Sequence, residues 1–404
     1  MAGTNSTADI AVVGAGIIGL AVARALLRSN PSKRLVVLDK EHAPALHQTG
    51  RNSGVIHSGV FYAPGSLKAQ LCVQGATALR QFCEQHAIET KACGKVIVAN
   101  GEAEERRLEE IHRRGIANGV VGLELIGPER LREIEPHAAG SSALHVPGTG
   151  IVDFGLVAAA LVGEIRQAGG ELRLGFEVTA IREHDGVTLG STAGEVHARN
   201  VIFCAGVYAD RLARLGGGDR EPRIVPFRGS YFILKPQARH LANALIYPVP
   251  DPAFPFLGIH TTLRMDGSMW LGPNAVLALG RESYSHLHVR PSDVIETMRS
   301  RGFRRLARKN LRLGVEEFVR DTNRRLFVGS AQRLLPELQT DDVERGPAGI
   351  RAQALNVDGS LVDDFVLERR QGVVHVRNAP SPGATSSLKI GERIAGMAAE
   401  AFRL

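Results

Sequence analysis

Three glycines near the start of the chain have the spacing of a dinucleotide-binding turn. Gly14, Gly16 and Gly19 lie in the stretch DIAVVGAGIIGLAVARALL, after the apolar residues 10–13 and at the start of a predicted helix. In this pattern the first glycine permits a tight turn, the second lets the backbone approach a pyrophosphate, and the third lets helix and strand pack closely. The N-terminus of such a helix offers N–H groups to phosphates.

The next predicted strand strengthens this interpretation. The stretch RLVVLDK contains Asp39, which lies 20 residues after Gly19 and could accept hydrogen bonds from ribose hydroxyls. We include the neighbouring Ile18 and Lys40 in the predicted cofactor site. The alternative is a glycine-rich packing turn that needs no ligand, but the order strand, glycines, helix, strand and acid favours dinucleotide binding.

The segment after Asp39 favours FAD over a nicotinamide cofactor. A nicotinamide enzyme would ordinarily continue with another strand and helix, whereas this chain continues with the polar, glycine-rich loop HQTGRNSGVIHSGVFYAPG. Gln48, Thr49, Asn52 and Ser53 offer short hydrogen-bonding side chains that suit a long, extended cofactor. A surface loop with incidental polarity is the alternative.

Two later strand ends carry similar signals. The first follows a strand near residue 203 and places small residues where backbone could approach a ligand. The second is a Pro/Gly/Ser turn between a strand at 373–377 and a helix capped near 385–387. The positive end of that helix could stabilise negative charge on a reduced flavin, or the helix could only pack. The predicted cofactor residues here are Val178, Ala205, Gly206, Pro380, Gly383, Ala384, Thr385 and Ser386.

Composition indicates a soluble α/β protein of two cooperating domains. The 404 residues are 44% hydrophobic and 23% charged and include 45 glycines, which argues against disordered, collagen-like and disulfide-stapled classes. The four cysteines have no metal-ligand spacing, so we expect reduced thiols and no metal. Because no run is long enough to span a membrane and the first residues do not resemble a signal peptide, we expect a cytoplasmic protein.

The basic charge is concentrated in one segment. The chain has 49 Lys and Arg against 42 Asp and Glu, and residues 299–312, RSRGFRRLARKNLR, hold seven basic residues and no acid. A general nucleic-acid surface is therefore not expected. On a helical wheel the arginines of 301–312 share one face, which could lie on an anionic bilayer at the inner face of the cell membrane. A solvated face and a field that steers an anionic substrate are the alternatives.

Three stretches resemble a known family. HQTGRNSGVIHSGVFYAPGSLKAQLCVQGA, PFLGIHTTLRMDGSMWLGPNAV and VRNAPSPGATSSLKIG are similar to the L-2-hydroxyglutarate dehydrogenase/oxidase family of D-amino-acid-oxidase-like FAD oxidoreductases, and the resemblance runs essentially end to end. It implies FAD, oxidation of L-2-hydroxyglutarate to 2-oxoglutarate, and an α/β (α+β) fold. In that fold a Rossmann-like FAD domain carries a discontinuous, largely antiparallel substrate domain. We assign 1–85, 150–212 and 330–404 to the FAD domain, and 86–149 and 213–329 to the substrate domain.

We expect a hydride to pass from C2 of the substrate to flavin N5 while a base takes the hydroxyl proton. His57, in the loop after the FAD signals, and His260, on a predicted substrate-domain strand, are the candidates, and either could instead be structural. Arg351 is a third candidate that could serve substrate and flavin together.

A dicarboxylate substrate requires fixed cationic and hydrogen-bonding groups, and arginine suits a bidentate grip on a carboxylate. Each candidate arginine could instead be a surface residue or part of a structural ion pair. The predicted substrate-binding residues are Tyr62, Arg228, Tyr231, Arg264 and Asn378.

Several alternatives stay open. Related enzymes of the superfamily oxidise glycine, glycerol 3-phosphate or malate, and a flavin-binding protein without turnover is a further alternative. The electron acceptor could be oxygen or a membrane quinone. We expect FAD to be held without a covalent bond, because no attachment motif is apparent.

Overall fold

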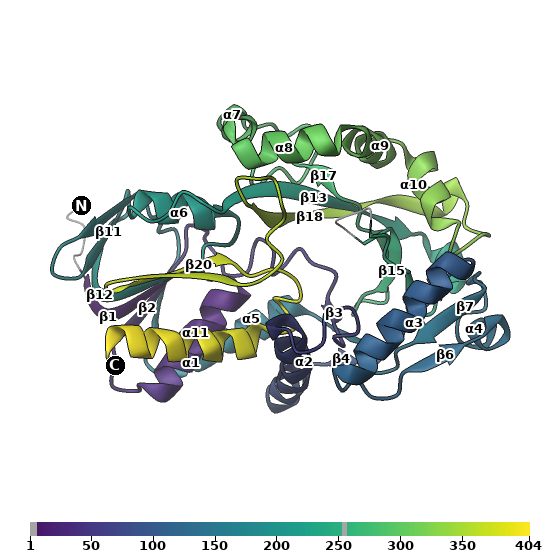
Figure 1. The fold of residues 1–404 in the computed structure, drawn as a ribbon. Coiled ribbons are helices and arrows are strands. Elements are labelled where there is room, and N and C mark those ends of the chain that lie inside the picture. Colours follow the sequence, from purple (N-terminus) through teal and green to yellow (C-terminus); the bar gives the residue numbers. More distant parts are fainter. Residues whose placement is uncertain (1–5, 253–256) are drawn as a thin grey trace.

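The computed structural model describes residues 6–252 and 257–404. An eight-stranded sheet forms one half of the molecule, on the left in Figure 1, together with the C-terminal end of the chain. Three smaller sheets form the other half. Among the described residues, no helix is long and apolar enough to cross a membrane. All four cysteines are free thiols, as predicted.

The eight-stranded sheet is built around parallel strands of the dinucleotide-binding type. The parallel neighbours run in the order β9, β2, β1, β12 and β20, whereas β10, β11 and β19 are joined by antiparallel pairing. Its strands are β1 (Ser6–Val13), β2 (Leu35–Leu38), β9 (Glu171–Arg173), β10 (Ala180–Glu183), β11 (Val187–Ser191), β12 (Gly194–Phe203), β19 (Val366–Arg370) and β20 (Val373–Asn378). The predicted Rossmann-like character of the fold is confirmed.

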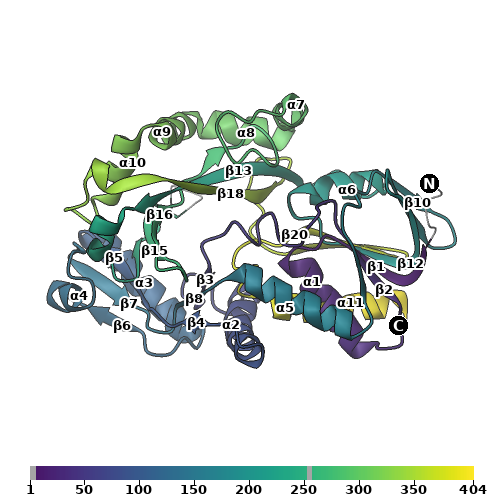
Figure 2. The same cartoon turned by 180° about the vertical axis from the view of Figure 1, so that it is seen from behind.

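Both faces of this sheet are covered, which explains why its central strands are continuously apolar. Along β1, Ile10 and Val12 pack with the helices α1 (Ile17–Ser29), α2 (Leu67–Gln85), α5 (Phe154–Gln167) and α11 (Ser387–Phe402). Ala11 and Val13 face the opposite layer, which includes the β10–β11 hairpin. On that side lie η1 (Gly206–Tyr208) and α6 (Ala209–Leu215), as both views show (Figures 1 and 2).

The second half contains antiparallel sheets, as the resemblance implied. Its five-stranded sheet is entirely antiparallel and consists of β13 (Arg223–Leu234), β15 (His260–Leu263), β16 (Met269–Gly272), β17 (Val276–Leu277) and β18 (Val343–Leu355). The four-stranded sheet consists of β5 (Lys95–Ala99), β6 (Glu124–Ile126), β7 (Ser142–His145) and β14 (Leu245–Pro248). A three-stranded sheet of β3 (Val55–Ile56), β4 (Thr90–Lys91) and β8 (Gly150–Val152) lies near the junction with the first half.

Helices cover the outside of this second half. The four-stranded sheet carries α3 (Glu102–Ala117) and α4 (Pro128–Ile134), and the five-stranded sheet carries α7 (Pro291–Arg299), α8 (Arg301–Lys309), α9 (Leu311–Thr322) and α10 (Arg324–Ala331) (Figure 1). The short helices η2 (Pro236–Leu241) and η3 (Thr340–Asp342) flank β13 and β18. The single basic helix expected at 301–312 is wrong: Asn310 interrupts it with φ −121° and ψ 24°, so Arg312 belongs to α9.

One boundary of the predicted domains disagrees with the sheets. We placed residues 330–404 with the FAD domain, yet β18 is hydrogen-bonded along its length to β13 of the five-stranded sheet. The chain rejoins the eight-stranded sheet only at β19. The division into two domains stays a prediction.

The packing of α11 on α1 gives a testable consequence. A methyl group on Gly391 of α11 would lie 2.7 Å from the Ala21 Cβ and 2.6 Å from its carbonyl carbon, whereas one on Gly396 of the same helix would meet open space. Gly391→Ala should lower the free energy of unfolding by about 1–3 kcal/mol through overpacking. Gly396→Ala should raise it by roughly 0.5–1 kcal/mol, because alanine favours helix. Urea unfolding measures both, and equal effects would contradict this packing.

Candidate active site

A cavity of about 840 Å³ lies between the eight-stranded and five-stranded sheets. Its walls come from segments far apart in the sequence: the β1–α1 turn, the loop after β2, the end of β12, the middle of β13 and β18, and the turn before α11. The volume falls within the roughly 300–1,000 Å³ range of small-molecule sites. Most of the predicted site residues meet here.

The β1–α1 turn forms the cofactor end of the cavity. Gly14 has φ +112°, and a Cβ there would lie 2.3 Å from the Cys204 carbonyl oxygen, so glycine is required. Gly16 is the N-cap of α1 without a side-chain cap, and Gly14, Gly16 and Ile18 line the cavity. A Cβ on Gly19 would lie 1.9 Å from the Gly14 carbonyl oxygen, so Gly19 serves the close packing of helix and strand.

Two side chains hold the backbone of this turn in place. The Ala15 N–H donates to Asp39 Oδ2 at 2.6 Å, and the Ile17 N–H donates to Thr49 Oγ1 at 2.9 Å. Both side chains also line the cavity. They therefore fix the turn on which a pyrophosphate would lie and present oxygen atoms to the same space.

The loop after β2 lines the cavity and is held by its own hydrogen bonds. Asn52 Nδ2 donates to the Thr49 carbonyl oxygen at 2.6 Å, and Asn52 Oδ1 accepts from the Gly54 N–H at 2.7 Å. Gln48, Asn52 and Ser53 all contribute to the wall. The loop is thus a built wall of the cavity and not an isolated surface loop.

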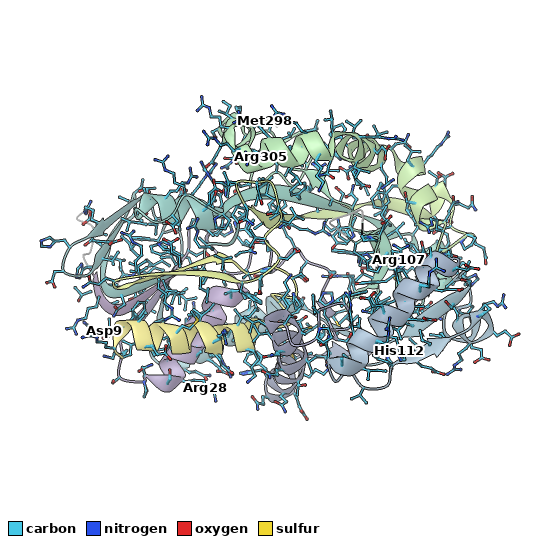
Figure 3. The ribbon with its side chains drawn as sticks, in the orientation of Figure 1. Asp9, Arg28, Arg107, His112, Met298 and Arg305 are labelled. Atoms are coloured by element: carbon cyan, nitrogen blue, oxygen red, sulfur yellow. The ribbon has the colours of Figure 1, made fainter. Side chains whose placement is uncertain are left out.

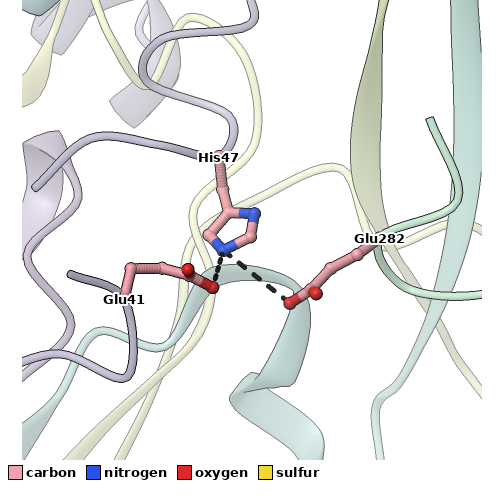
Figure 4. A group of neighbouring side chains, drawn as sticks. All are labelled: Glu41, His47 and Glu282. Carbon is pink, nitrogen blue, oxygen red and sulfur yellow. Dashed lines mark hydrogen bonds and ion pairs between the residues drawn. The ribbon is translucent and has the colours of Figure 1, made fainter. Parts of the chain in front are cut away.

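A charged cluster closes one side of this loop (Figure 4). His47 Nε2 lies 2.9 Å from Glu41 Oε1 and 3.7 Å from Glu282 Oε1. Lys40 forms ion pairs with both carboxylates, at 2.6 Å for Glu282, and so already supplies their positive partner. The cluster joins the loop after β2 to the segment before α7, across the rim of the cavity. Sequence reasoning found Lys40 but not its acidic partners.

The remaining predicted cofactor residues meet at the carboxyl ends of the sheet and at α11. Val178, Ala205, Gly206, Pro380, Gly383, Ala384 and Thr385 line the cavity. Thr385 Oγ1 accepts from the His57 N–H at 3.1 Å and donates to the Val55 carbonyl oxygen at 3.2 Å, so this turn positions the backbone of the catalytic candidate.

The start of α11 fits a polar ligand. Its N-cap, Ser386, makes no side-chain cap, and the hydroxyls of Ser386 and Ser387 are buried without a hydrogen-bond partner among the described residues. Buried polar groups are normally satisfied, so unsatisfied hydroxyls at an uncapped helix end are consistent with a bound polar group nearby. Ser386 itself lies behind the cavity wall. Together with the glycine-rich turn before α1, this part of the cavity wall fits a dinucleotide.

The opposite end of the cavity gathers the predicted chemical residues. His57, Tyr231, His260 and Arg351 all line it. His260 Nδ1 lies 2.8 Å from the Gly258 carbonyl oxygen, so a neutral imidazole donates from Nδ1 and leaves Nε2 as an acceptor. Arg351 Nη1 donates to the Asn274 carbonyl oxygen at 3.1 Å, which fixes the guanidinium on β18.

Burial keeps both histidines neutral at this end. It lowers the pKa of His57 to about 3, with further effects from Lys95 and His260, and the pKa of His260 to about 4, with further effects from Arg351 and Lys95. Each imidazole is therefore available to accept a proton at neutral pH. A bound carboxylate would raise both pKa values again.

Two predicted substrate ligands lie outside the cavity wall. Arg228 is buried in an ion pair with Asp321 of α9 at 2.5 Å and contacts His286, so its charge is already compensated. Arg264 donates to the Asn52 carbonyl oxygen at 3.0 Å, and its guanidinium carbon lies 4.3 Å from the centre of the Trp270 ring. Both arginines hold elements together, and we correct their predicted role accordingly.

Of two further predicted substrate ligands, Asn378 lines the cavity and Tyr62 does not. The Tyr62 hydroxyl lies near Ser381, which does line the cavity. Asn378 lines the cavity while its Nδ2 donates to the carbonyl oxygens of Val362 and Asp364 at 2.9 and 2.8 Å. Both therefore shape the wall near the α11 turn.

Sequence reasoning missed Tyr247 and Lys95. Tyr247 lines the cavity and its ring centre lies 4.0 Å from that of His260. Lys95, at the start of β5, is 2% exposed. The signal for each was a polar group inside an apolar run, LANALIYPVP and GKVIVA, which a buried strand would not otherwise contain.

Comparison with known proteins places the chain. A family model described as FAD dependent oxidoreductase matches residues 9–397. L-2-hydroxyglutarate dehydrogenases are similar over nearly the whole chain. The mitochondrial enzyme of Nematostella vectensis is 48% identical (98% of this chain, 91% of that protein), and the L-2-hydroxyglutarate dehydrogenase of Salmonella houtenae is 43% identical (96% and 92%). The chain belongs to the L-2-hydroxyglutarate dehydrogenase family. The mitochondrial relative from Homo sapiens is 46% identical over 99% of this chain and 90% of that protein.

Solved structures support the fold of this family member. L-alpha-glycerophosphate oxidase from Mycoplasma pneumoniae, with FAD bound, has a TM-score of 0.79 at 22% identity (99% of this chain, 95% of that chain). Glycine oxidase from Geobacillus kaustophilus has a TM-score of 0.70 at 19% identity (98% and 95%). The chain is an FAD-dependent oxidoreductase, and FAD is its cofactor.

Proposed function

We propose that this enzyme oxidises L-2-hydroxyglutarate to 2-oxoglutarate. Relatives with 43–48% identity are named L-2-hydroxyglutarate dehydrogenases. The structural observation that supports the proposal is the positively charged end of the cavity. There Arg351 and two neutral histidines line the wall, with Lys95 behind them. A substrate with two carboxylates complements such a site.

Bound FAD supplies the hydride acceptor, at flavin N5. The protein supplies the base: we assign proton removal from the C2 hydroxyl to His260 Nε2, because Gly258 occupies Nδ1. His57, whose backbone is fixed by Thr385, lies on the same cavity wall and is the second candidate. Proton transfer by a positioned side chain contributes typically about 10²–10⁴-fold.

Arg351 and Tyr231 are the proposed ligands of a substrate carboxylate. Both side chains line the cavity, Tyr231 buried and Arg351 half-buried, and each affects the pKa of the other, as groups near one another do. Tyr231 also lies beside Trp270, with ring centres 5.0 Å apart, so its hydroxyl is held in a rigid setting. These two residues replace Arg228 and Arg264 in the proposed site.

We further propose that a membrane quinone accepts the electrons and that α8 and α9 contact the cytoplasmic face of the membrane. Arg301, Arg304 and Arg308 of α8 are exposed. The adjoining α9 exposes apolar side chains by 43–67%: Leu311, Val315, Phe318 and Val319. Figure 3 places Met298 and Arg305 at the edge of the molecule remote from Arg107 and His112 of α3. Basic and apolar groups on one edge suit an anionic bilayer.

Substrate preference tests the proposed reaction. The enzyme should turn over L-2-hydroxyglutarate with a kcat/KM at least about 100-fold above that for L-lactate, because lactate leaves the cationic wall without its second carboxylate. Steady-state kinetics with quinone and with oxygen as acceptors measures this. Equal kcat/KM for both acids would contradict the proposed substrate, and faster oxidation of glycerol 3-phosphate, malate or glycine would support one of those alternatives.

The histidine assignment predicts a pH profile. With free-enzyme pKa values near 3 and 4, both imidazoles stay neutral from pH 6 to 8, so kcat/KM should not fall as the pH is lowered across this interval. His260→Gln should slow flavin reduction in a single turnover by about 10²-fold or more. Near-normal reduction in both His260→Gln and His57→Gln, or an acid limb near pH 6.5, would contradict the assignment.

Membrane contact predicts salt-sensitive binding to vesicles. Replacing Arg301, Arg304 and Arg308 with Gln should remove about 1 kcal/mol each from binding to anionic vesicles. The matched control replaces three exposed arginines of α3 and α4, Arg106, Arg113 and Arg132. Co-sedimentation at low and high salt measures the difference. Absence of binding at low salt would exclude this contact, whereas unchanged binding with weaker substrate affinity in the α8 variant would favour substrate steering.

A further inference from the structure

Lys95 is a buried cation that the proposed reaction does not use. Its side chain lies among aromatic rings, with Nζ 4.7 Å from the centre of the Phe61 ring and 5.2 Å from that of Tyr247. No carboxylate oxygen of residues 6–252 or 257–404 lies within 4 Å of Nζ; in that part of the chain the lysines with ion pairs are Lys40 and Lys389. Within the described part of the chain, this ammonium has cation–π contacts with Phe61 and Tyr247 and no ion pair.

The ammonium lies one aromatic ring behind the cavity. Tyr247 lines the cavity and packs on His260, whereas Lys95 is not part of the wall. Lys95 therefore contacts the ring of a wall residue while its own side chain lies behind the wall. At such a depth, water screens a charge poorly, so its field reaches into the cavity.

Among the residues that the structure describes, no carboxylate lies close enough to Lys95 to form an ion pair with it. The titratable groups that face it are Cys72 from α2, His57 from the loop after β3, Tyr247 from β14 and His260 from β15. Burial lowers the pKa of Lys95 to about 8 and raises that of the Cys72 thiol to about 12, so the lysine is charged and the thiol neutral at pH 7. A buried charge without a counter-ion destabilises the free protein.

We propose that Lys95 is a specificity-determining residue that selects dicarboxylates. Its ammonium, acting through space from behind Tyr247, supplies the positive charge for the second substrate carboxylate, while Arg351 binds the first. The inference rests on the proposed function for the identity of the substrate. Lys95 is not a catalytic residue, because it does not line the cavity.

Binding of non-reacting acids to the FAD-loaded enzyme tests this directly. Dissociation constants for glutarate and butyrate are measured at pH 7 from the perturbation of flavin absorbance. Lys95→Met should weaken the binding of glutarate on the order of tenfold and leave the binding of butyrate nearly unchanged. Lys95→Arg should keep most of the preference for glutarate. Lys91→Met, at an exposed position four residues earlier, is the matched control and should change neither constant.

The pH dependence gives an independent readout. Because the wild-type lysine loses its charge as the pH rises through about 8, glutarate affinity should fall between pH 7 and 9.5, whereas Lys95→Arg should show no such fall. The affinity of the Lys95→Met variant for glutarate should be low and should not change with pH over the same interval. Its melting temperature should equal or exceed that of the wild type, since Met removes an uncompensated charge.

Two outcomes would overturn the proposal: equal weakening of glutarate and butyrate in Lys95→Met, which indicates a structural role, or an unchanged preference for glutarate. A test of the reaction itself stays separate. If L-2-hydroxyglutarate fails to reduce the flavin of the wild-type enzyme, the proposed function fails, while the ratio of glutarate to butyrate binding still decides the role of Lys95.

Discussion

Burial of positive charge without a carboxylate beside it is the constraint on which the substrate end of this enzyme depends. Lys95 lies among aromatic rings, and burial keeps His57 and His260 neutral. At the cofactor end the balance is reversed: Asp39, Glu41 and Glu282 are held by backbone N–H groups or by Lys40. The cavity thus has one end suited to ribose and phosphate groups and a positively charged end suited to an anionic substrate.

The path of the chain makes this separation necessary. The cofactor end is formed where parallel strands of the eight-stranded sheet end, and the substrate end by β13, β14, β15 and β18 of the other half. The turn at Thr385 connects the two, because its hydroxyl contacts both Val55 and His57. Placing FAD and the candidate bases on one cavity therefore requires the chain to pass between the halves several times.

Local sequence patterns allowed much of this site to be predicted. The remaining residues could not be predicted, because their roles depend on contacts with residues far away in the sequence. The glycines of the β1–α1 turn, Asp39 and the α11 turn are recognisable because each signal lies within one strand, turn and helix. Arg228 was misplaced because its partner, Asp321, lies 93 residues away on another element. Lys95 was missed because nothing local shows that its ammonium lacks an ion-pair partner among the described residues. Asn310 ended a helix that the spacing of arginines alone would have continued.

Anaerobic mixing of the FAD-loaded enzyme with a panel of 2-hydroxy and amino acids decides whether L-2-hydroxyglutarate is its substrate, because the absorbance of oxidised flavin reports cofactor, catalysis and substrate together. We expect rapid and complete loss of that absorbance with L-2-hydroxyglutarate, and much slower loss with L-lactate, glycine and D-2-hydroxyglutarate. Faster reduction by a monocarboxylate, or no reduction by any acid of the panel, would contradict this assignment.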